Sequence, residues 1–163
     1  MSEYQNYKQM IVTSAQKLTH LGFLMATGGN LSLRIKGKEA FVITPSNFDY
    51  LKMTAEDVCV LDFDLNVLEG KHKPSVESAM HGAIYQVRSD VNAVVHTHQV
   101  YASTLALINK PIPTLFDEQA RFLGRSVNII SYAPSGTGML KNTIAKHVKD
   151  HNNAYIMQNH GAL

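Results

Sequence analysis

Residues 92–108 read NAVVHTHQVYASTLALI, an apolar, β-branched run that ends in two histidines and then takes on helical spacing. Side chains alternate faces along a strand, so His96 and His98 are expected to point the same way, with Thr97 on the opposite face. Two imidazole rings on one face indicate a polar site where the strand ends. The stretch therefore predicts a strand, a site and a helix in succession.

The sequence on either side predicts paired strands first and an alternation of helices and strands afterwards. This order is typical of an α/β fold in which helices cover a mixed sheet. No repeat or linker divides the chain, so one domain over residues 1–163 is expected. The predicted helices are 4–20, 75–87, 100–108 and 137–151, and the predicted strands are 31–35, 40–44, a hairpin over 58–70 with its tip at 64–66, 92–98, 127–134 and 154–160.

Composition argues against several classes of protein. The chain has 163 residues, of which 45% are hydrophobic and 17% charged, with 15 Lys+Arg against 13 Asp+Glu. The basic residues are scattered, so nucleic acid is not an expected partner, and no apolar run is long enough to predict a membrane span. The N-terminus does not resemble a secretory signal. The single cysteine, Cys59, is expected to be a buried, inert thiol, which suits the cytoplasm.

A third histidine could complete a metal site with His96 and His98. A catalytic metal commonly has three protein ligands and one open position. His160 is the best candidate, because it closes the last apolar strand and precedes Gly161, where backbone can approach closely. The remaining candidates are expected to be solvated surface residues: His20, His72, His147 and His151.

Glu77 is the candidate acid or base. It lies near a predicted helix start, where Ser75 is a plausible N-cap, and a carboxylate beside a divalent cation can act as a ligand or carry a proton. His81 follows four residues later on the same helix face, so a Glu–His hydrogen bond is possible. A solvated surface position is nevertheless the favoured interpretation of His81.

The turn ATGGNLS precedes the first predicted strand and contains two consecutive glycines. Backbone N–H groups in such a turn, with Thr27, Asn30 and Ser32 as further donors, could form a nest for an anion such as phosphate. A tight turn between helix and strand would need the same glycines. Composition alone favours that structural interpretation.

Taken together, five motifs along the chain favour a functional over a purely structural interpretation of these residues. In sequence order they are ATGGNLSLR, ITPSN, KPSVE, AVVHTH and QNHG. From about Gln9 to Leu163 the chain resembles the class II aldolase and adducin-head family. The resemblance implies a three-layer α/β/α fold with a mixed, mostly antiparallel sheet, in a domain that lacks the family's C-terminal helices. It also implies a zinc ion on His96, His98 and His160, with manganese or cobalt as alternatives, a catalytic Glu77, and phosphate binding by Thr27, Gly29, Asn30, Ser46 and Ser75.

The function that the resemblance implies is a zinc-dependent aldolase. It would cleave a phosphorylated ketose, such as L-fuculose 1-phosphate, to dihydroxyacetone phosphate and an aldehyde through a metal-stabilised enediolate. A sugar-phosphate dehydratase, a 4-epimerase or a 3-oxo-tetronate-phosphate decarboxylase of the same family is the alternative. An adducin-like scaffold is disfavoured, because it would lack the histidine triad. Homotetramers are also typical of the family.

Four positions depart from the pattern of the fuculose-phosphate aldolases. Val76 stands where they have a second phosphate-binding serine, and Asn47 stands where they have glycine. Asp117 and Glu118 replace side chains that are often aromatic or histidine in relatives. These differences predict a changed phosphate site and a substrate other than fuculose phosphate. Glu77 itself favours a lyase, because the related epimerases carry Asp at this position.

Overall fold

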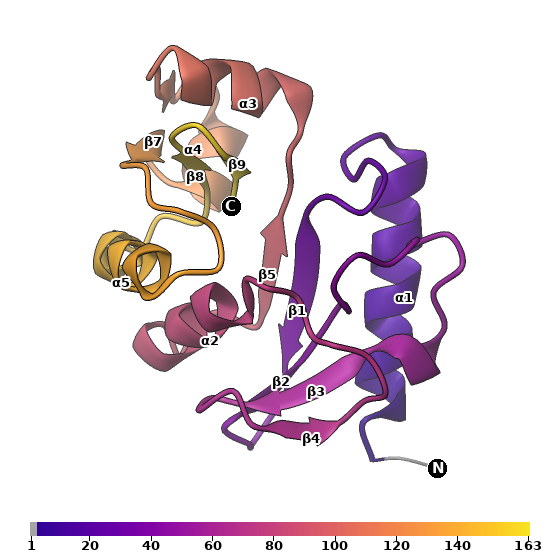
Figure 1. Cartoon of the computed structure of the whole chain (residues 1–163). Coiled ribbons are helices and arrows are strands. Elements are labelled where there is room, and N and C mark those ends of the chain that lie inside the picture. The colour runs from indigo at the N-terminus through magenta and orange to yellow at the C-terminus, as the bar shows by residue number, and fades with distance from the viewer. Residues whose placement is uncertain (1–2) are drawn as a thin grey trace.

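The strands lie in two sheets that meet beyond the end of β5 (Figure 1). The computed structural model describes residues 3–163. Within that part of the chain, no helix is both long and apolar enough to cross a membrane. The elements are α1 (Gln5–His20), β1 (Asn30–Arg34), β2 (Ala40–Ile43), η1 (Ala55–Asp57), β3 (Cys59–Asp62), β4 (Val67–Glu69), α2 (Ser78–Val87), β5 (Ala93–His96), α3 (Val100–Leu107), β6 (Ile112–Pro113), α4 (Asp117–Leu123), β7 (Ser126–Ile130), α5 (Gly138–His147), η2 (Val148–Asp150), β8 (Tyr155–Met157) and β9 (Gly161–Ala162).

The first sheet is antiparallel and has the strand order β4-β3-β2-β1-β5. Its register places Asn30, the first residue of β1, opposite His96, the last residue of β5. The second sheet has the order β6-β7-β8-β9, and only β7 and β8 run parallel. A bridge between Thr97 and Ala162 connects the two sheets, so the chain stays extended for one residue beyond β5.

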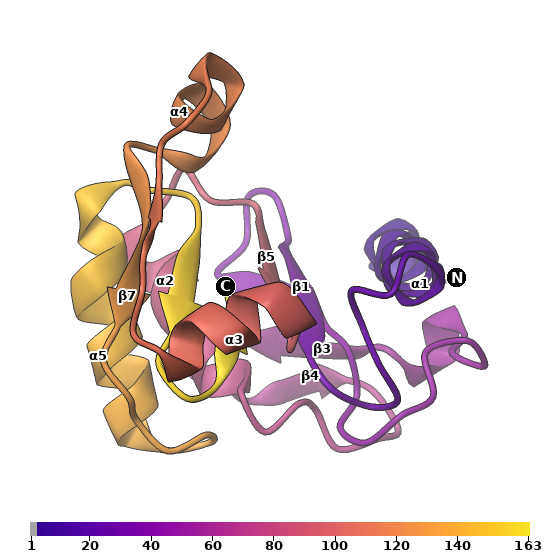
Figure 2. The same ribbon diagram turned by 90° about the horizontal axis from the view of Figure 1, so that it is seen from above.

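Helices cover both faces of the first sheet, as alternating side chains require (Figure 2). On one face, α1 packs through Ile11 and Ala15 against a core that includes Val42 and Val60. On the other face, a second core contains Phe41 and Leu61 together with residues of α2 and α5. Neighbouring residues of β2 and β3 thus serve opposite cores, which is the period-two pattern of a strand buried on both sides. The predicted α/β fold with helices covering mostly antiparallel strands is confirmed, and the strands are divided between two sheets.

The structure corrects several local predictions. The helix predicted from residue 75 begins at Ser78, with Glu77 rather than Ser75 as its N-cap residue. The last apolar strand ends at Met157, so His160 lies in the turn between β8 and β9. Helix α4 and the two-residue strands β6 and β9 were not predicted. Such short elements carry too few residues for a hydrophobic period to be recognised.

Candidate metal centre and its cavity

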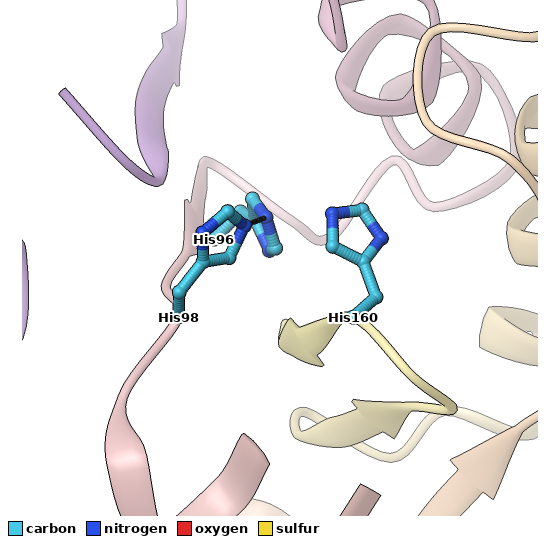
Figure 3. Close-up of side chains that lie close together, drawn as sticks. All are labelled: His96, His98 and His160. Carbon is cyan, nitrogen blue, oxygen red and sulfur yellow. Dashed lines mark hydrogen bonds between the residues drawn. The ribbon is translucent and has the colours of Figure 1, made fainter. Parts of the chain in front are cut away.

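Three imidazole rings converge where the two sheets meet (Figure 3). His96 ends β5, His98 follows two residues later, and His160 comes from the turn before β9. One nitrogen of each ring lies within 4.8 Å of the others. The ring centroid of His96 is 4.8 Å from that of His98 and 4.8 Å from that of His160. The structure therefore brings together the three histidines that the sequence analysis proposed as metal ligands.

Backbone pairing explains this convergence. The Thr97 amide donates to the Ala162 carbonyl at 3.0 Å, and the Ala162 amide donates back at 2.9 Å. His96 and His98 flank Thr97, and His160 lies two residues before Ala162, so one bridge places all three rings. Gly161 is required here, because a Cβ atom at this position would collide with the Thr97 carbonyl oxygen.

His96 is held in the state that a metal ligand needs. Its Nδ1 donates to the Ala162 carbonyl at 2.8 Å, so Nε2 of the neutral ring carries the free lone pair. Burial lowers the pKa of His96 to about 4, an effect that the Glu77 carboxylate offsets only in part. Burial also lowers the pKa of His98, with a further contribution from His160. Three imidazole side chains form a donor set that suits zinc and other borderline divalent metals.

Glu77 lies against this triad. Its Oε2 is 3.3 Å from His96 Nε2, and its Oε1 is 3.1 Å from His160 Nε2. Oε2 also accepts from Asn30 Nδ2 at 2.8 Å, and Oε1 accepts from Ser135 Oγ at 2.7 Å. Burial alone would raise the pKa of Glu77, but these hydrogen bonds and the neighbouring histidines outweigh it, so the pKa lies well below the ordinary value. The carboxylate is therefore ionised at neutral pH.

A cavity of about 250 Å³ opens beside the triad. All five residues proposed to bind phosphate line it, and so do Glu77, His98 and His160. None of its lining residues among positions 3–163 is lysine or arginine, so the donors available to an anion there are neutral side chains and backbone N–H groups, and the Glu77 carboxylate lines the same cavity. The complete lining is Thr27, Gly28, Gly29, Asn30, Pro45, Ser46, Asn47, Tyr50, Ser75, Val76, Glu77, His98, Ser135 and His160.

The glycine turn beside the cavity is fixed by sterics and by one hydrogen bond. Gly29 has φ +79°, and a Cβ atom there would lie 2.6 Å from the His96 carbonyl oxygen. The Tyr50 hydroxyl donates to the Gly29 carbonyl at 2.5 Å. The turn is thus packed against the strand that carries His96. Both the structural and the anion-binding interpretations of these glycines remain compatible with its position.

Comparison with known proteins identifies the family. The family described as "Class II Aldolase and Adducin N-terminal domain" matches residues 9–163. The chain belongs to this family.

Members of known activity are similar over almost the whole chain. A 5-deoxy-D-ribulose 1-phosphate aldolase from Bacillus thuringiensis serovar kurstaki is 34% identical over 159 residues, which are 98% of this chain and 74% of that protein. An L-fuculose phosphate aldolase from Escherichia coli O6:H1 is 34% identical over 161 residues, covering 99% and 73%. A solved L-fuculose 1-phosphate aldolase superposes with a TM-score of 0.91 at 34% identity, covering 99% and 74%. The predictions of a class II aldolase family member, its fold and its enzyme class are confirmed.

Two of the residues that depart from the expected fuculose-phosphate aldolase pattern, Asn47 and Val76, line the cavity. Asn47 has φ +52°, a left-handed conformation that asparagine tolerates better than other residues with a side chain, which explains how it replaces glycine. Val76 is 66% exposed and offers an apolar surface where fuculose-phosphate aldolases are expected to carry serine. Asp117 and Glu118 lie in the first turn of α4 and do not line the cavity.

The prediction that His81 is solvated was wrong. His81 is fully buried, and its two ring nitrogens contact Asn30 and Ser32. Ser135, which contacts Glu77 from the loop before α5, was also missed. Neither residue carries a sequence signal of its own. The alternation of β1 is the one usable clue, because it turns Asn30 and Ser32 toward the α2 face.

The other predicted surface histidines lie outside the triad. His20 and His151 are exposed, whereas His147 bonds to the Thr143 carbonyl. His72 is only partly exposed and contacts the Asp57 carboxylate at 2.9 Å. Cys59 is buried and free, as predicted, and burial raises the pKa of its thiol.

Proposed function

We propose that this chain is a metal-dependent aldolase that cleaves a phosphorylated ketose to dihydroxyacetone phosphate and an aldehyde. The observation that carries the proposal is the position of Glu77, whose carboxylate lies 3.1 Å from His160 Nε2 and 3.3 Å from His96 Nε2 at the wall of the cavity. A base, a metal-binding triad and a set of neutral anion donors share one space. The aldolase relatives support this assignment.

Zinc is the metal we propose, bound by His96, His98 and His160. A bound divalent cation would supply Lewis-acid stabilisation of the negative charge that develops on the substrate oxygens. Three imidazole nitrogens fit this role, because a catalytic metal commonly keeps three protein ligands and one position for water or substrate. Manganese and cobalt fit the same donor set and are outcomes that metal analysis distinguishes.

Glu77 would carry the proton. When the carbon–carbon bond breaks, the carbon that becomes the aldehyde loses its hydroxyl proton, and the electron pair of the broken bond stays with the ketone-bearing fragment. That fragment must receive one proton on carbon before dihydroxyacetone phosphate leaves, so the ionised Glu77 would take up the hydroxyl proton and then donate it to this carbon. Glu77 is ionised and held by Asn30 and Ser135, so its position is defined before the substrate arrives. A fixed carboxylate within reach of the reacting carbon is what general acid–base catalysis requires.

Phosphate would bind to neutral donors of the cavity wall. We propose Thr27, Gly29, Asn30, Ser46 and Ser75 as its contacts, through hydroxyl, amide and backbone N–H groups. Val76 removes one donor that the fuculose-phosphate aldolases are expected to provide. We propose a five-carbon ketose phosphate as a substrate beside the six-carbon fuculose phosphate, because one relative is named for a five-carbon sugar.

The proposed function is tested by measuring the metal content of the protein and then identifying its reaction products. Protein purified without chelator or nickel is assayed for zinc and then incubated with a panel of ketose 1-phosphates. Release of dihydroxyacetone phosphate supports the aldolase. Formation of a dehydrated, epimerised or decarboxylated product would replace it with the corresponding family reaction, and a protein that binds no metal and transforms nothing would point to a scaffold.

A homotetramer and a cytoplasmic location are further parts of this proposal. Large apolar side chains are exposed on and around α3 and α4, as expected of a surface that another subunit covers. The free Cys59 fits a reducing compartment. Light scattering on the purified protein tests the tetramer directly. The exposed side chains include Val100, Tyr101, Leu107, Ile108, Phe116 and Phe122.

A further inference from the structure

A continuous chain of hydrogen bonds runs from Glu77 into the core. Asn30 joins the Glu77 carboxylate to His81, whose Nε2 lies 2.5 Å from Asn30 Oδ1. His81 Nδ1 lies 2.6 Å from Ser32 Oγ, and Ser32 Oγ lies 2.7 Å from the Tyr85 hydroxyl. All five side chains are at most 5% exposed. Burying so many polar groups is tolerated because each has its partner.

The donor of each hydrogen bond in this series can be assigned in turn, starting from Glu77. An ionised carboxylate can only accept hydrogen bonds, so the Asn30 group that faces it must be the NH₂. The Asn30 carbonyl then faces His81, and a carbonyl can also only accept. His81 must therefore carry its proton on Nε2.

The remaining directions follow from the neutrality of His81. Complete burial and, to a smaller extent, the nearby His96 lower the pKa of His81 to about 3 against the opposing effect of Glu77, so the ring is neutral at physiological pH. Its Nδ1 is then an acceptor, Ser32 donates to it, and the Tyr85 hydroxyl donates to Ser32. Every O–H and N–H in this hydrogen-bond chain therefore points toward Glu77.

We propose that His81 is a positioning residue whose Nε2–H holds the Asn30 amide in the orientation that donates to Glu77. The assignment rests on the proposed function of Glu77 as proton carrier. If the amide rotated by half a turn, its carbonyl oxygen would face the carboxylate, and two acceptors would repel each other at 2.8 Å. His81 excludes that orientation, because its N–H needs an acceptor. Glu77 is thereby held in one place.

Three variants distinguish a role of His81 in positioning Asn30 from a role in packing alone. His81→Phe fills the same space but cannot donate, so it leaves the Asn30 carbonyl without its partner. His81→Gln restores a donor at the same reach. Tyr85→Phe is the matched control, because it removes one buried hydrogen bond from the same helix while leaving the His81–Asn30 bond intact.

The kinetic experiment uses the metal-loaded enzyme and the ketose phosphate that the wild type cleaves. We expect His81→Phe to lower kcat by about 10- to 100-fold while KM stays within about threefold and metal content is unchanged, because misplacement of a base affects the chemical step. His81→Gln should recover most of kcat, and Tyr85→Phe should stay within about threefold. A His81→Phe variant with kcat within twofold of wild type would overturn the proposal, as would a Tyr85→Phe loss as large as that of His81→Phe.

A second measurement needs no turnover and still applies if His81→Phe fails to fold. Nitrogen-15 NMR of histidine-labelled wild-type protein, with the His81 signals assigned by their absence in His81→Gln, reports which ring nitrogen carries the proton. We expect the Nε2–H form, unchanged from about pH 5.5 to 8. An Nδ1–H form or a titration near pH 6.5 would refute the proposal. If the wild type cleaves no sugar phosphate, the proposed function fails while this spectrum still decides the hydrogen-bond chain.

Discussion

Thr97 and Ala162 exchange two backbone hydrogen bonds and thereby join the two sheets. This pair is also the centre of the histidine triad, because His96 and His98 flank one partner and His160 lies two residues before the other. The segment that follows β5 of the antiparallel first sheet and the turn of the mixed second sheet each contribute histidines that the other lacks. The candidate site is therefore a property of how the sheets meet, and of neither sheet alone.

Removal of one imidazole should abolish metal binding. We expect His98→Ala to lose bound zinc and turnover together, since two remaining nitrogens form a much weaker site. Metal content by plasma mass spectrometry measures this. His147→Ala on α5 is the control and should retain both, because its ring bonds to a helix carbonyl away from the triad. Loss of zinc from the control would place the site elsewhere.

Glu77→Gln should separate metal binding from chemistry. The amide keeps the shape of the side chain but cannot carry the proton, so we expect zinc to be retained and kcat to fall by about 10²- to 10⁴-fold. The variant is assayed for metal and for release of dihydroxyacetone phosphate. Near wild-type turnover would show that another group moves the proton.

Two glycines with the same backbone conformation should respond differently to alanine. Gly29 and Gly37 have φ of +79° and +76°, so both variants incur the strain of a left-handed residue, about 1 kcal/mol. At Gly29 the new Cβ would also lie 2.6 Å from the His96 carbonyl oxygen, whereas Gly37 has open space. Thermal unfolding should show a clearly larger loss for Gly29→Ala, with loss of zinc as well. Equal losses of stability in the two variants would show that the turn at Gly29 shifts to accommodate the new Cβ atom.

Ser46→Ala tests the phosphate end of the cavity. A hydrogen bond to a charged group contributes roughly 1.5–3 kcal/mol, so we expect KM for the phosphorylated substrate to rise about tenfold or more with little change in kcat. Ser14→Ala, on an exposed part of α1, is the matched control. If the KM rise is the same for a substrate without phosphate, Ser46 contacts another part of the sugar.

Stability should depend on pH through His81. Its folded pKa of about 3 lies below the ordinary value of 6.5, so the folded state binds fewer protons and stability falls as pH drops from about 6.5 toward 3. Between pH 6.5 and 4.5 this costs on the order of 2 kcal/mol. Urea unfolding of metal-free wild type and His81→Gln measures it, and the variant should have the shallower decline. Parallel declines would show that His81 does not titrate on unfolding.

The sequence predicts elements whose side chains follow a regular pattern. It does not predict contacts between single residues that lie far apart in the chain. The alternation in β1, the apolar run of β2 and the position of His96 at a strand end are visible in the chain itself. The burial of His81 is not, since its partners lie 49 and 51 positions away in β1. His81 also follows Glu77 at a spacing that suits an exposed ion pair equally well. Only the packing of α2 against β1 decides between these environments.

The Thr97–Ala162 bridge between the two sheets also determines when the three histidines can come together during synthesis. Hairpins such as β1–β2 form between near neighbours, whereas Ala162 follows Thr97 by 65 positions, and closing so long a loop comes late. His96 and His98 leave the ribosome long before His160 does. A nascent chain would therefore hold only part of the proposed metal site until residues 160–162 have been made and have joined β5, so a metal would be bound by all three histidines only after this long-range contact has formed.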